Sequence, residues 1–291
     1  MKTMELVRLL DIPEEVEKQL ADYENSREII IPDDLISRIL KRSQWDDSIK
    51  KLQELLGDDP AGIKILWELL HIVSTYSYEE YGKRGIPDDI FIATMKFCTR
   101  FLRERYKNFR DYNFVWAWWF PRQISLCEYR VGALEYEFVD GEEREIAIHI
   151  PADADMRKES VARSLEEFEQ FKKRYYPQWE NVSMTCDTWM LMPELKELLG
   201  EDSNIIAFQD LFEIDIVNHD ATWYRNWIFP GAGSVDEDLP EDTTLQRSLK
   251  KYLLAGNKFG VAKGHLVRNV SSVELVCAAK GGRPGSVKGM T

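Results

Sequence analysis

Residues 130–150 read RVGALEYEFVDGEEREIAIHI, and the spacing of apolar side chains in this stretch decides the fold. Two runs, 133–139 and 144–150, alternate apolar and polar residues, which is the two-residue period of a β-strand with one buried face. Asp140-Gly141 between them is a turn signal. The stretch therefore predicts an antiparallel hairpin whose apolar face comprises Leu134, Tyr136, Phe138, Ile146, Ile148 and Ile150.

The same spacing predicts the register of the hairpin. If the apolar residues of both runs share one face, Asp140 pairs with Arg144 around a three-residue loop. His149 then lies directly opposite Glu135, with about 5 Å between the two Cβ atoms. A carboxylate at that distance can orient the imidazole and raise its basicity. A purely structural His–Glu pair on a half-buried face is the alternative.

Downstream of the hairpin, strand-like and helix-like segments alternate. We expect a helix over 157–176, ended by Pro177, a short helix over 193–199 and another over 243–254. Further strands are expected over 122–130, 182–191, 204–217 and 258–268. Meandering strands followed by a crossover helix predict a mixed β-sheet flanked by helices.

Upstream, residues 1–119 carry helix signals. The phrase Ile-Pro-acid-acid or its equivalent recurs at residues 12, 31 and 86, and proline followed by acids suits a first helical turn. The predicted fold class is α+β, with a helical N-terminal domain over 1–119 and a mixed-sheet domain over 120–270. Residues 271–291 have turn composition and are expected to form a mobile tail.

Composition excludes several classes of function. The formal net charge is −13, which argues against a nucleic-acid partner and against docking on an anionic membrane. The N-terminus has no signal-peptide pattern, so we predict a cytoplasmic protein. No His, Asp, Glu or Cys spacing indicates a metal site, and the oligomeric state stays open.

An aromatic stretch joins the two predicted domains. It contains Tyr112, Phe114, Trp116, Trp118, Trp119 and Phe120. Core packing at a domain junction is the favoured interpretation. An apolar wall for an acyl chain is the alternative.

Four phrases carry a resemblance to a known family. They are residues 130–137 (RVGALEYE), 148–151 (IHIP), 186–189 (CDTW) and 202–205 (DSNI). With them the chain resembles, over about residues 1–270, a bacterial family described as an N-acyltransferase N-terminal domain joined to a GNAT-like C-terminal domain.

That resemblance implies a fold and a cosubstrate. Two neighbouring strands of a GNAT sheet splay apart and hold an acyl-CoA thioester, and the following helix points its N-terminus at the pyrophosphate. Here 144–150 and 182–191 would be those strands and 157–176 that helix. The implied CoA-binding residues are Arg157, Lys158 and Arg163, and the implied substrate-binding residues are Glu137, Thr188, Trp189 and Asn204.

Two departures from the family pattern are visible. The usual glycine-rich pyrophosphate loop is replaced by residues 151–158 (PADADMRK), which contain two aspartates and no glycine. A glycine-containing segment, Gly260–Gly264, lies on the last predicted strand and matches the loop only weakly. Family members often carry Cys-His-Ser-Trp where this chain has residues 186–189 (CDTW), so a histidine role cannot be transferred to position 187.

Amide formation from a thioester requires a base, an oxyanion donor and an acid. His149 is the first candidate for the base, with Glu135 beside it. Cys186 is a candidate nucleophile or acid if His149 lies across the splay from it, and a buried, inert cysteine is the alternative. The predicted function is direct transfer of an acyl group from acyl-CoA to a small-molecule or peptide amine. The alternative is a non-catalytic GNAT-like binding module that has lost its CoA loop.

Overall fold

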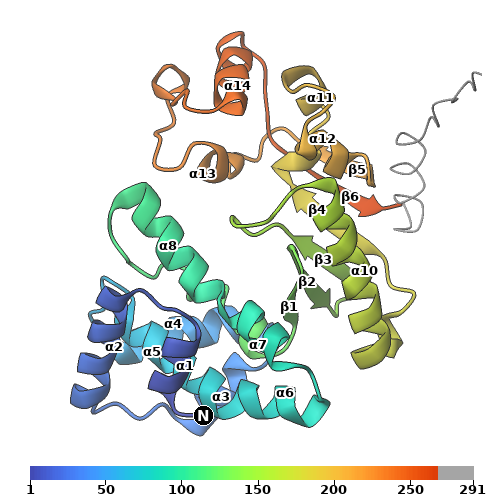
Figure 1. Ribbon diagram of the computed structural model, residues 1–291. Coiled ribbons are helices and arrows are strands. Elements are labelled where there is room, and N and C mark those ends of the chain that lie inside the picture. Colours follow the sequence, from blue (N-terminus) through green and yellow to red (C-terminus); the bar gives the residue numbers. More distant parts are fainter. Residues whose placement is uncertain (268–291) are drawn as a thin grey trace, which may run out of the picture.

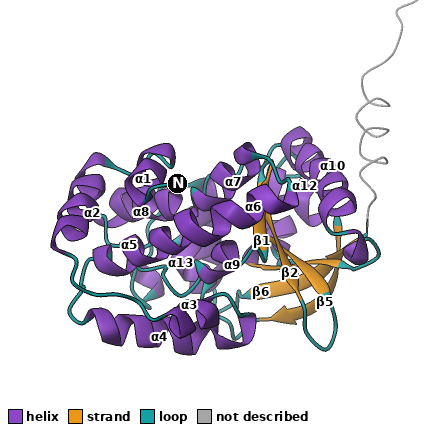
Figure 2. Cartoon of the chain, turned by 90° about the horizontal axis from the view of Figure 1, so that it is seen from below, coloured by secondary structure: helices purple, strands orange, loops and turns teal. Residues whose placement is uncertain are grey.

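The computed structural model describes residues 1–267, and the predicted tail over 271–291 lies outside this range. Figure 1 shows a helical N-terminal half beside a sheet that one long helix covers. The two halves meet along the face of the sheet that this long helix leaves free (Figure 2). No helix within the described range is long and apolar enough to cross a membrane.

The N-terminal half is entirely helical, as the sequence predicts. Apolar side chains from these helices form one continuous core with those of the sheet. The helices are α1 (Thr3–Leu9), α2 (Glu14–Ser26), α3 (Asp33–Ile39), η1 (Arg42–Gln44), α4 (Trp45–Leu56), α5 (Ile63–Ile72), the π-helical turn η2 (Val73–Ser77), α6 (Tyr78–Arg84), α7 (Asp88–Met95), α8 (Phe97–Phe109) and α9 (Pro121–Ile124).

The C-terminal half is a six-stranded mixed sheet with strand order β1-β2-β3-β4-β6-β5. Among the strands of residues 1–267 only β3 and β4 run parallel, and every other neighbouring pair is antiparallel. The strands are β1 (Glu128–Val131), β2 (Leu134–Val139), β3 (Glu145–His149), β4 (Met184–Thr188), β5 (Phe212–Asn218) and β6 (Val261–Leu266). The helices between them are α10 (Lys158–Tyr175), η3 (Pro177–Trp179), η4 (Trp189–Leu191), α11 (Leu195–Leu198), α12 (Asn204–Gln209), α13 (Tyr224–Ile228), η5 (Asp236–Asp238) and α14 (Thr244–Leu254).

The predicted hairpin register is confirmed. Glu135 pairs with His149, and Glu137 pairs with Ala147. Arg144 donates a hydrogen bond to Asp140 across the loop, at 2.8 Å. The two-residue period excludes a slip of one residue, which would turn every isoleucine towards the polar face, and the turn at Asp140-Gly141 selects this pairing among the registers that remain.

The apolar face of the hairpin packs against α10. The rings of Tyr136 and Phe168 stack with centroids 3.8 Å apart, and both side chains are fully buried. A tight turn joins β1 to β2 at Gly132, which has a φ of +62°. A Cβ at Gly132 would lie 3.0 Å from Ser164 of α10, so glycine lets the turn approach the helix closely.

Three sequence predictions need correction. The strand expected over 122–130 begins only at Glu128, because Pro121 starts the short helix α9. The strand expected over 204–217 is helix α12 followed by β5, since Ser203 caps a helix start through the backbone N–H of Ile205. The strand expected over 182–191 ends at Thr188, where η4 begins.

Candidate active site between the sheet and the helical half

His149 ends β3 and projects from the polar face of the sheet. Its Nε2 lies 3.0 Å from Oε2 of Glu137. The indole of Trp119 meets the imidazole edge-on, with ring centroids 5.1 Å apart. A neutral imidazole whose Nε2 faces a carboxylate carries its hydrogen on that nitrogen, so Nδ1 keeps a lone pair that can accept a proton.

The helical half supplies the cations that hold Glu137. Oε1 of this buried carboxylate lies 2.6 Å from Nη2 of Arg42, at the start of η1. It also lies 3.3 Å from Nε of Arg122 in α9. The guanidinium of Arg122 in turn covers the ring of Trp119 at 3.9 Å from its centroid. The residue that orients His149 is therefore fixed by groups from the other half of the chain.

A second carboxylate, Glu128, lies directly opposite Glu137 on β1. It is fully buried. Its two oxygens accept hydrogen bonds from Nε1 of Trp119 at 3.1 Å and from Nε2 of Gln123 at 2.7 Å. Both donors are neutral, so the direct partners of Glu128 differ from those of Glu137, which pairs with two arginines.

These surroundings push the two carboxyl groups in opposite directions. Burial, with the charges of Glu135 and Glu137, raises the pKa of Glu128 to about 8 against the opposing effect of His149. Burial also opposes ionisation of Glu137, but the hydrogen bond from His149 and the two arginines outweigh it and lower its pKa to about 2.

The charge of His149 is favoured by the same carboxylates. Burial alone would lower the pKa of His149, yet the hydrogen bond to Glu137 and the charge of Glu128 outweigh burial and raise it. Neighbouring ionisable groups whose pKa values are driven apart are common in catalytic sites.

The structure does not place the carboxylate of Glu135, the predicted orienting residue, against the imidazole of His149. Glu135 does lie opposite His149, but its carboxylate forms an ion pair with Arg100 of α8 instead. Glu137, the diagonal neighbour, is the residue that reaches the imidazole. Arg100 comes from helix α8, outside the hairpin. The alternation within the hairpin therefore could not reveal that Glu137, and not Glu135, contacts His149.

The sheet opens next to His149. Strands β3 and β4 pair only at Ile146–Met184 and Ala147–Thr185, although each strand is five residues long. We call the divergence beyond these pairs the splay. The backbone N–H of Ile146 donates to Ser183 across the two strands. Since alternate peptide groups of a strand point to the same side, the N–H of Asp187 points into the splay.

Aromatic rings lead away from His149 across the junction of the two halves. Trp119 contacts Trp118, which stacks on Trp116. Trp116 meets Trp227 of α13 with centroids 5.8 Å apart. Trp118 is 46% exposed and Trp227 is 37% exposed, so this run of rings is only partly used for packing.

Cys186 does not join His149. It alternates with Thr185 and Asp187 on β4 and lies on the apolar face, on the same side as Met184. The side chain is almost fully buried, and burial with the nearby charge of Asp187 raises the pKa of its thiol. A buried thiol without a neighbouring cation is a poor nucleophile.

The predicted CoA-binding residues lie at the start of α10. Lys158 and Arg163 are exposed. The side chain of Arg157 pairs with Asp155, whose carboxylate also accepts hydrogen bonds from the backbone N–H of Arg157 and from Ser160. The helix N-terminus that would face a pyrophosphate therefore already has an anion beside it.

The remaining predicted substrate-binding residues serve local structure around β4 and α12. Thr188 is buried and accepts a hydrogen bond from the backbone N–H of Met190 at the start of η4. Trp189 is also buried. Asn204 is the exposed first residue of α12. Glu137 is the only member of this predicted set that contacts His149 among the described residues.

The weak glycine match on the last strand has a packing role. A Cβ at Gly264 of β6 would lie 2.5 Å from the carbonyl oxygen of Glu213 on β5. A Cβ at Gly260 would lie 2.0 Å from the carbonyl oxygen of Asn218. These glycines let β5 and β6 approach each other and do not form a loop around a phosphate.

Glu128, Glu137 and His149 also bring one potential metal ligand atom each to within 4.8 Å of one another. The sequence spacing gave no sign of this grouping. Arg42 and Arg122 already neutralise Glu137, and a divalent cation would be repelled by both. The cluster therefore suits proton chemistry better than metal binding.

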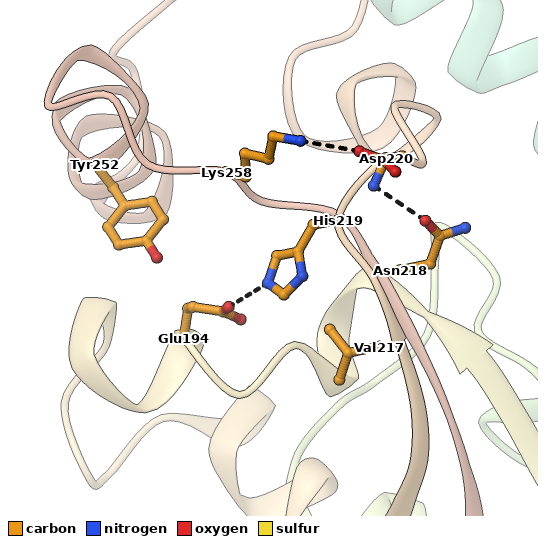
Figure 3. A pocket seen from close by; sticks show the side chains of 7 residues that line it. All are labelled: Glu194, Val217, Asn218, His219, Asp220, Tyr252 and Lys258. Carbon is orange, nitrogen blue, oxygen red and sulfur yellow. Dashed lines mark hydrogen bonds and ion pairs between the residues drawn. The ribbon is translucent and has the colours of Figure 1, made fainter.

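A separate open hollow of about 560 Å³ lies beyond the end of β5 (Figure 3). His219 contacts Glu194 there at 2.6 Å, and Lys258 contacts Asp220 at 3.0 Å. The charged groups on its wall are thus paired with one another. Tyr252 of α14 closes one side (Figure 3).

Sequence reasoning missed several residues of the His149 site. Glu128 could have been found, because continuing the alternation through β1 places it on the polar face opposite Glu137. Arg42 and Arg122 carry no such signal. Trp119 belongs to the aromatic stretch singled out in the sequence, but its contact with His149 depends on how the helical half packs against the sheet.

Family models match almost the whole described chain. The model of the N-acyltransferase N-terminal domain matches residues 1–126, and that of the GNAT-like C-terminal domain matches residues 128–266. No curated protein matches the chain.

Solved structures of acyltransferases share the fold. One, in complex with decanoyl-CoA and teicoplanin, is 20% identical with a TM-score of 0.71, over 90% of this chain and 86% of that chain. An acyltransferase mutant in complex with octanoyl-CoA is 19% identical with a TM-score of 0.72, over 91% and 87%. A third, with decanoyl-CoA, is 18% identical with a TM-score of 0.65, over 91% and 99%.

The strand order, the splay and the two matched domains agree with one another. The chain therefore belongs to the family of proteins that join an N-acyltransferase N-terminal domain to a GNAT-like C-terminal domain.

Proposed function

We propose that this protein is an N-acyltransferase that moves an acyl group from acyl-CoA directly to an amine. The observation that carries the proposal is the splay, which places an oriented imidazole beside two strands that stop pairing. A thioester between these strands would lie next to the lone pair on Nδ1 of His149. The acyl-CoA complexes of acyltransferases with the same fold support this cosubstrate.

The chemistry assigns one role to each group. His149 takes one proton from the attacking ammonium, and the freed lone pair forms the C–N bond. The backbone N–H of Asp187 points into the splay and donates to the oxyanion of the tetrahedral intermediate. Collapse breaks the C–S bond. The second nitrogen proton goes to the departing thiolate, and His149 later releases its proton to solvent.

The aromatic side chains from Trp119 to Trp227 favour an acyl-CoA with an extended acyl chain as the donor. It begins at the imidazole and continues along partly exposed rings, which is the apolar wall that the sequence left as an alternative. An aliphatic chain would bury apolar surface there at about 25 cal/mol per Å². The described acyltransferases hold octanoyl and decanoyl chains, which fits this class of donor.

A non-catalytic binding module is the second candidate. Asp155 at the start of α10 favours it, because this carboxylate stands where a pyrophosphate would bind and already holds Arg157 and Ser160. In that case the GNAT-like sheet would bind another partner through the same surface.

Calorimetric titration of acetyl-CoA and decanoyl-CoA separates the two candidates. We expect both wild type and His149→Ala to bind at least decanoyl-CoA. In a screen of small-molecule and peptide amines, His149→Ala should then lower kcat by about 10²–10⁴-fold, because general-base catalysis contributes this much. Absence of binding by every CoA ester would reject the enzyme and leave the binding module.

A further inference from the structure

Asp187 lies on a central strand of the sheet, yet its carboxylate has no partner within the described part of the chain. Strand β4 runs between β3 and β6, and Asp187 is exposed there. Among residues 1–267 the Asp187 side chain has no hydrogen-bond or ion-pair partner, whereas Glu135 and Glu137 on the same face each have at least one. A free carboxylate in a central strand is available to a ligand.

The lysine opposite Asp187 is already engaged with another carboxylate. Lys263 lies opposite Asp187 on β6, but its Nζ contacts Oε2 of Glu145 at 2.6 Å. Thr185 donates to the same oxygen at 3.0 Å. Glu145 therefore holds Lys263, and the carboxylate of Asp187 stays open.

Asp187 faces His149 across the splay. The last pair between the strands is Ala147–Thr185. Two residues further along each strand, on the same face of the sheet, are His149 and Asp187. Burial and Glu145 raise the pKa of Asp187, while Lys263 and His149 favour its charged form.

We propose that Asp187 binds the ammonium group of the acceptor amine, which makes this protein selective for cationic amines. This inference rests on the proposed function and names the acceptor side of the same site. A carboxylate across the splay from the Nδ1 lone pair holds the ammonium while His149 removes one of its protons. The formal net charge of −13 adds long-range attraction for a cationic acceptor.

Binding can be tested without turnover. Hexylammonium chloride is titrated into wild type, Asp187→Asn and Asp187→Glu, with hexan-1-ol as the uncharged probe. We expect Asp187→Asn to raise the Kd of hexylammonium at least tenfold and Asp187→Glu to restore part of the affinity. The Kd of hexan-1-ol should be the same in all three proteins. Equal affinity of wild type and Asp187→Asn, or no hexylammonium binding by wild type, would overturn the inference.

A kinetic arm separates this inference from the proposed function. If wild type transfers acyl groups, Asp187→Asn should raise KM for the amine at least tenfold and leave the Kd of decanoyl-CoA unchanged. Asp215→Asn is the matched control, since this aspartate pairs with His265 on edge strand β5. If Asp187→Asn transferred acyl groups normally with an unchanged KM for the amine, only the role of Asp187 would be rejected. If wild type transferred no acyl group, the proposed enzymatic function would be rejected.

Discussion

The two faces of the β2–β3 hairpin come from alternate residues of the same strands but are stabilised in different ways. On one face Tyr136 and Phe138 pack against Phe168 of α10, and within residues 1–267 the one polar contact of these side chains with α10 is the hydrogen bond between the hydroxyls of Tyr136 and Ser164. On the other face Glu137 forms ion pairs with Arg42 and Arg122 of the helical half and a hydrogen bond with His149. Hence one face contributes mainly to stability, and the other holds the candidate chemistry.

The two faces also differ in how their interactions depend on pH. An apolar contact depends on area and shape, so it changes little with pH. A buried carboxylate changes its charge with its surroundings, and two that lie side by side are driven to different pKa values. Substitutions on each face test whether the two faces can be altered independently.

The largest expected effect is on the apolar face. Phe168→Ala removes a fully buried ring that stacks on Tyr136, so it leaves a cavity between α10 and the sheet. We expect the free energy of unfolding to fall by about 3–5 kcal/mol. Urea denaturation followed by tryptophan fluorescence measures this loss.

Phe109→Ala is the matched control, because Phe109 at the end of α8 is 45% exposed. Its effect should be about 1 kcal/mol or less. Similar losses in the two variants would mean that the apolar face is not the main source of stability in the hairpin.

Sequence alone predicted the apolar face because that face obeys a local period. The alternation placed Glu135 opposite His149 and every isoleucine inside, and it needed no knowledge of the rest of the chain. The polar face could not be predicted in the same way. Arg100 pairs with Glu135, whereas Arg42 and Arg122 hold Glu137 beside His149. Each of these arginines comes from a helix outside the hairpin.

The splay was expected from the family resemblance, and no spacing in the sequence indicates it. Asp187 was visible in the sequence only as a departure from the family pattern. Its exposure and lack of a partner became visible only once Lys263 was placed against Glu145. The position of Cys186 was not predictable for a related reason. No local pattern indicated which side of β4 faces His149, and Cys186 lies on the opposite, apolar side.

The second effect is on the stability of the polar face. Between about pH 4.5 and 8 the folded protein keeps a proton on Glu128 that the unfolded chain releases. Stability therefore falls as pH rises through this window. Glu128→Gln removes the titration while keeping an uncharged side chain of the same shape. We expect the free energy of unfolding of Glu128→Gln to exceed that of wild type by about 4 kcal/mol at pH 8, and by less than about 1 kcal/mol at pH 5.

Thermal unfolding of both proteins from pH 5 to 8 measures that difference. Glu104→Gln is a useful comparison, because burial also raises the pKa of this carboxyl but it lies on α8, away from His149. If the stability difference between Glu128→Gln and wild type stayed constant from pH 5 to 8, Glu128 would be ionised throughout this range. The inference that a neutral Glu128 lies beside a charged Glu137 would then be wrong.

The smallest effect distinguishes the two glutamates of β2. If His149 is the base, it must be neutral, so kcat/KM for the amine rises with pH through a midpoint above the ordinary histidine value of 6.5. Glu137→Gln removes the closest carboxylate and leaves Arg42 and Arg122 unpaired beside the imidazole, which lowers the pKa of His149. The midpoint should move to lower pH, and the plateau rate should fall about tenfold because Nε2 loses its charged partner.

Glu135→Gln is the control that makes this measurement decisive. Glu135 lies directly opposite His149, but Arg100 holds its carboxylate, so its charge reaches the imidazole more weakly. Its midpoint should move less than that of Glu137→Gln. If Glu135→Gln produced the larger shift, the cross-strand partner that the sequence predicts would be the true one. The ion pair from α8 would then be dispensable, and the polar face would follow the same local rule as the apolar face.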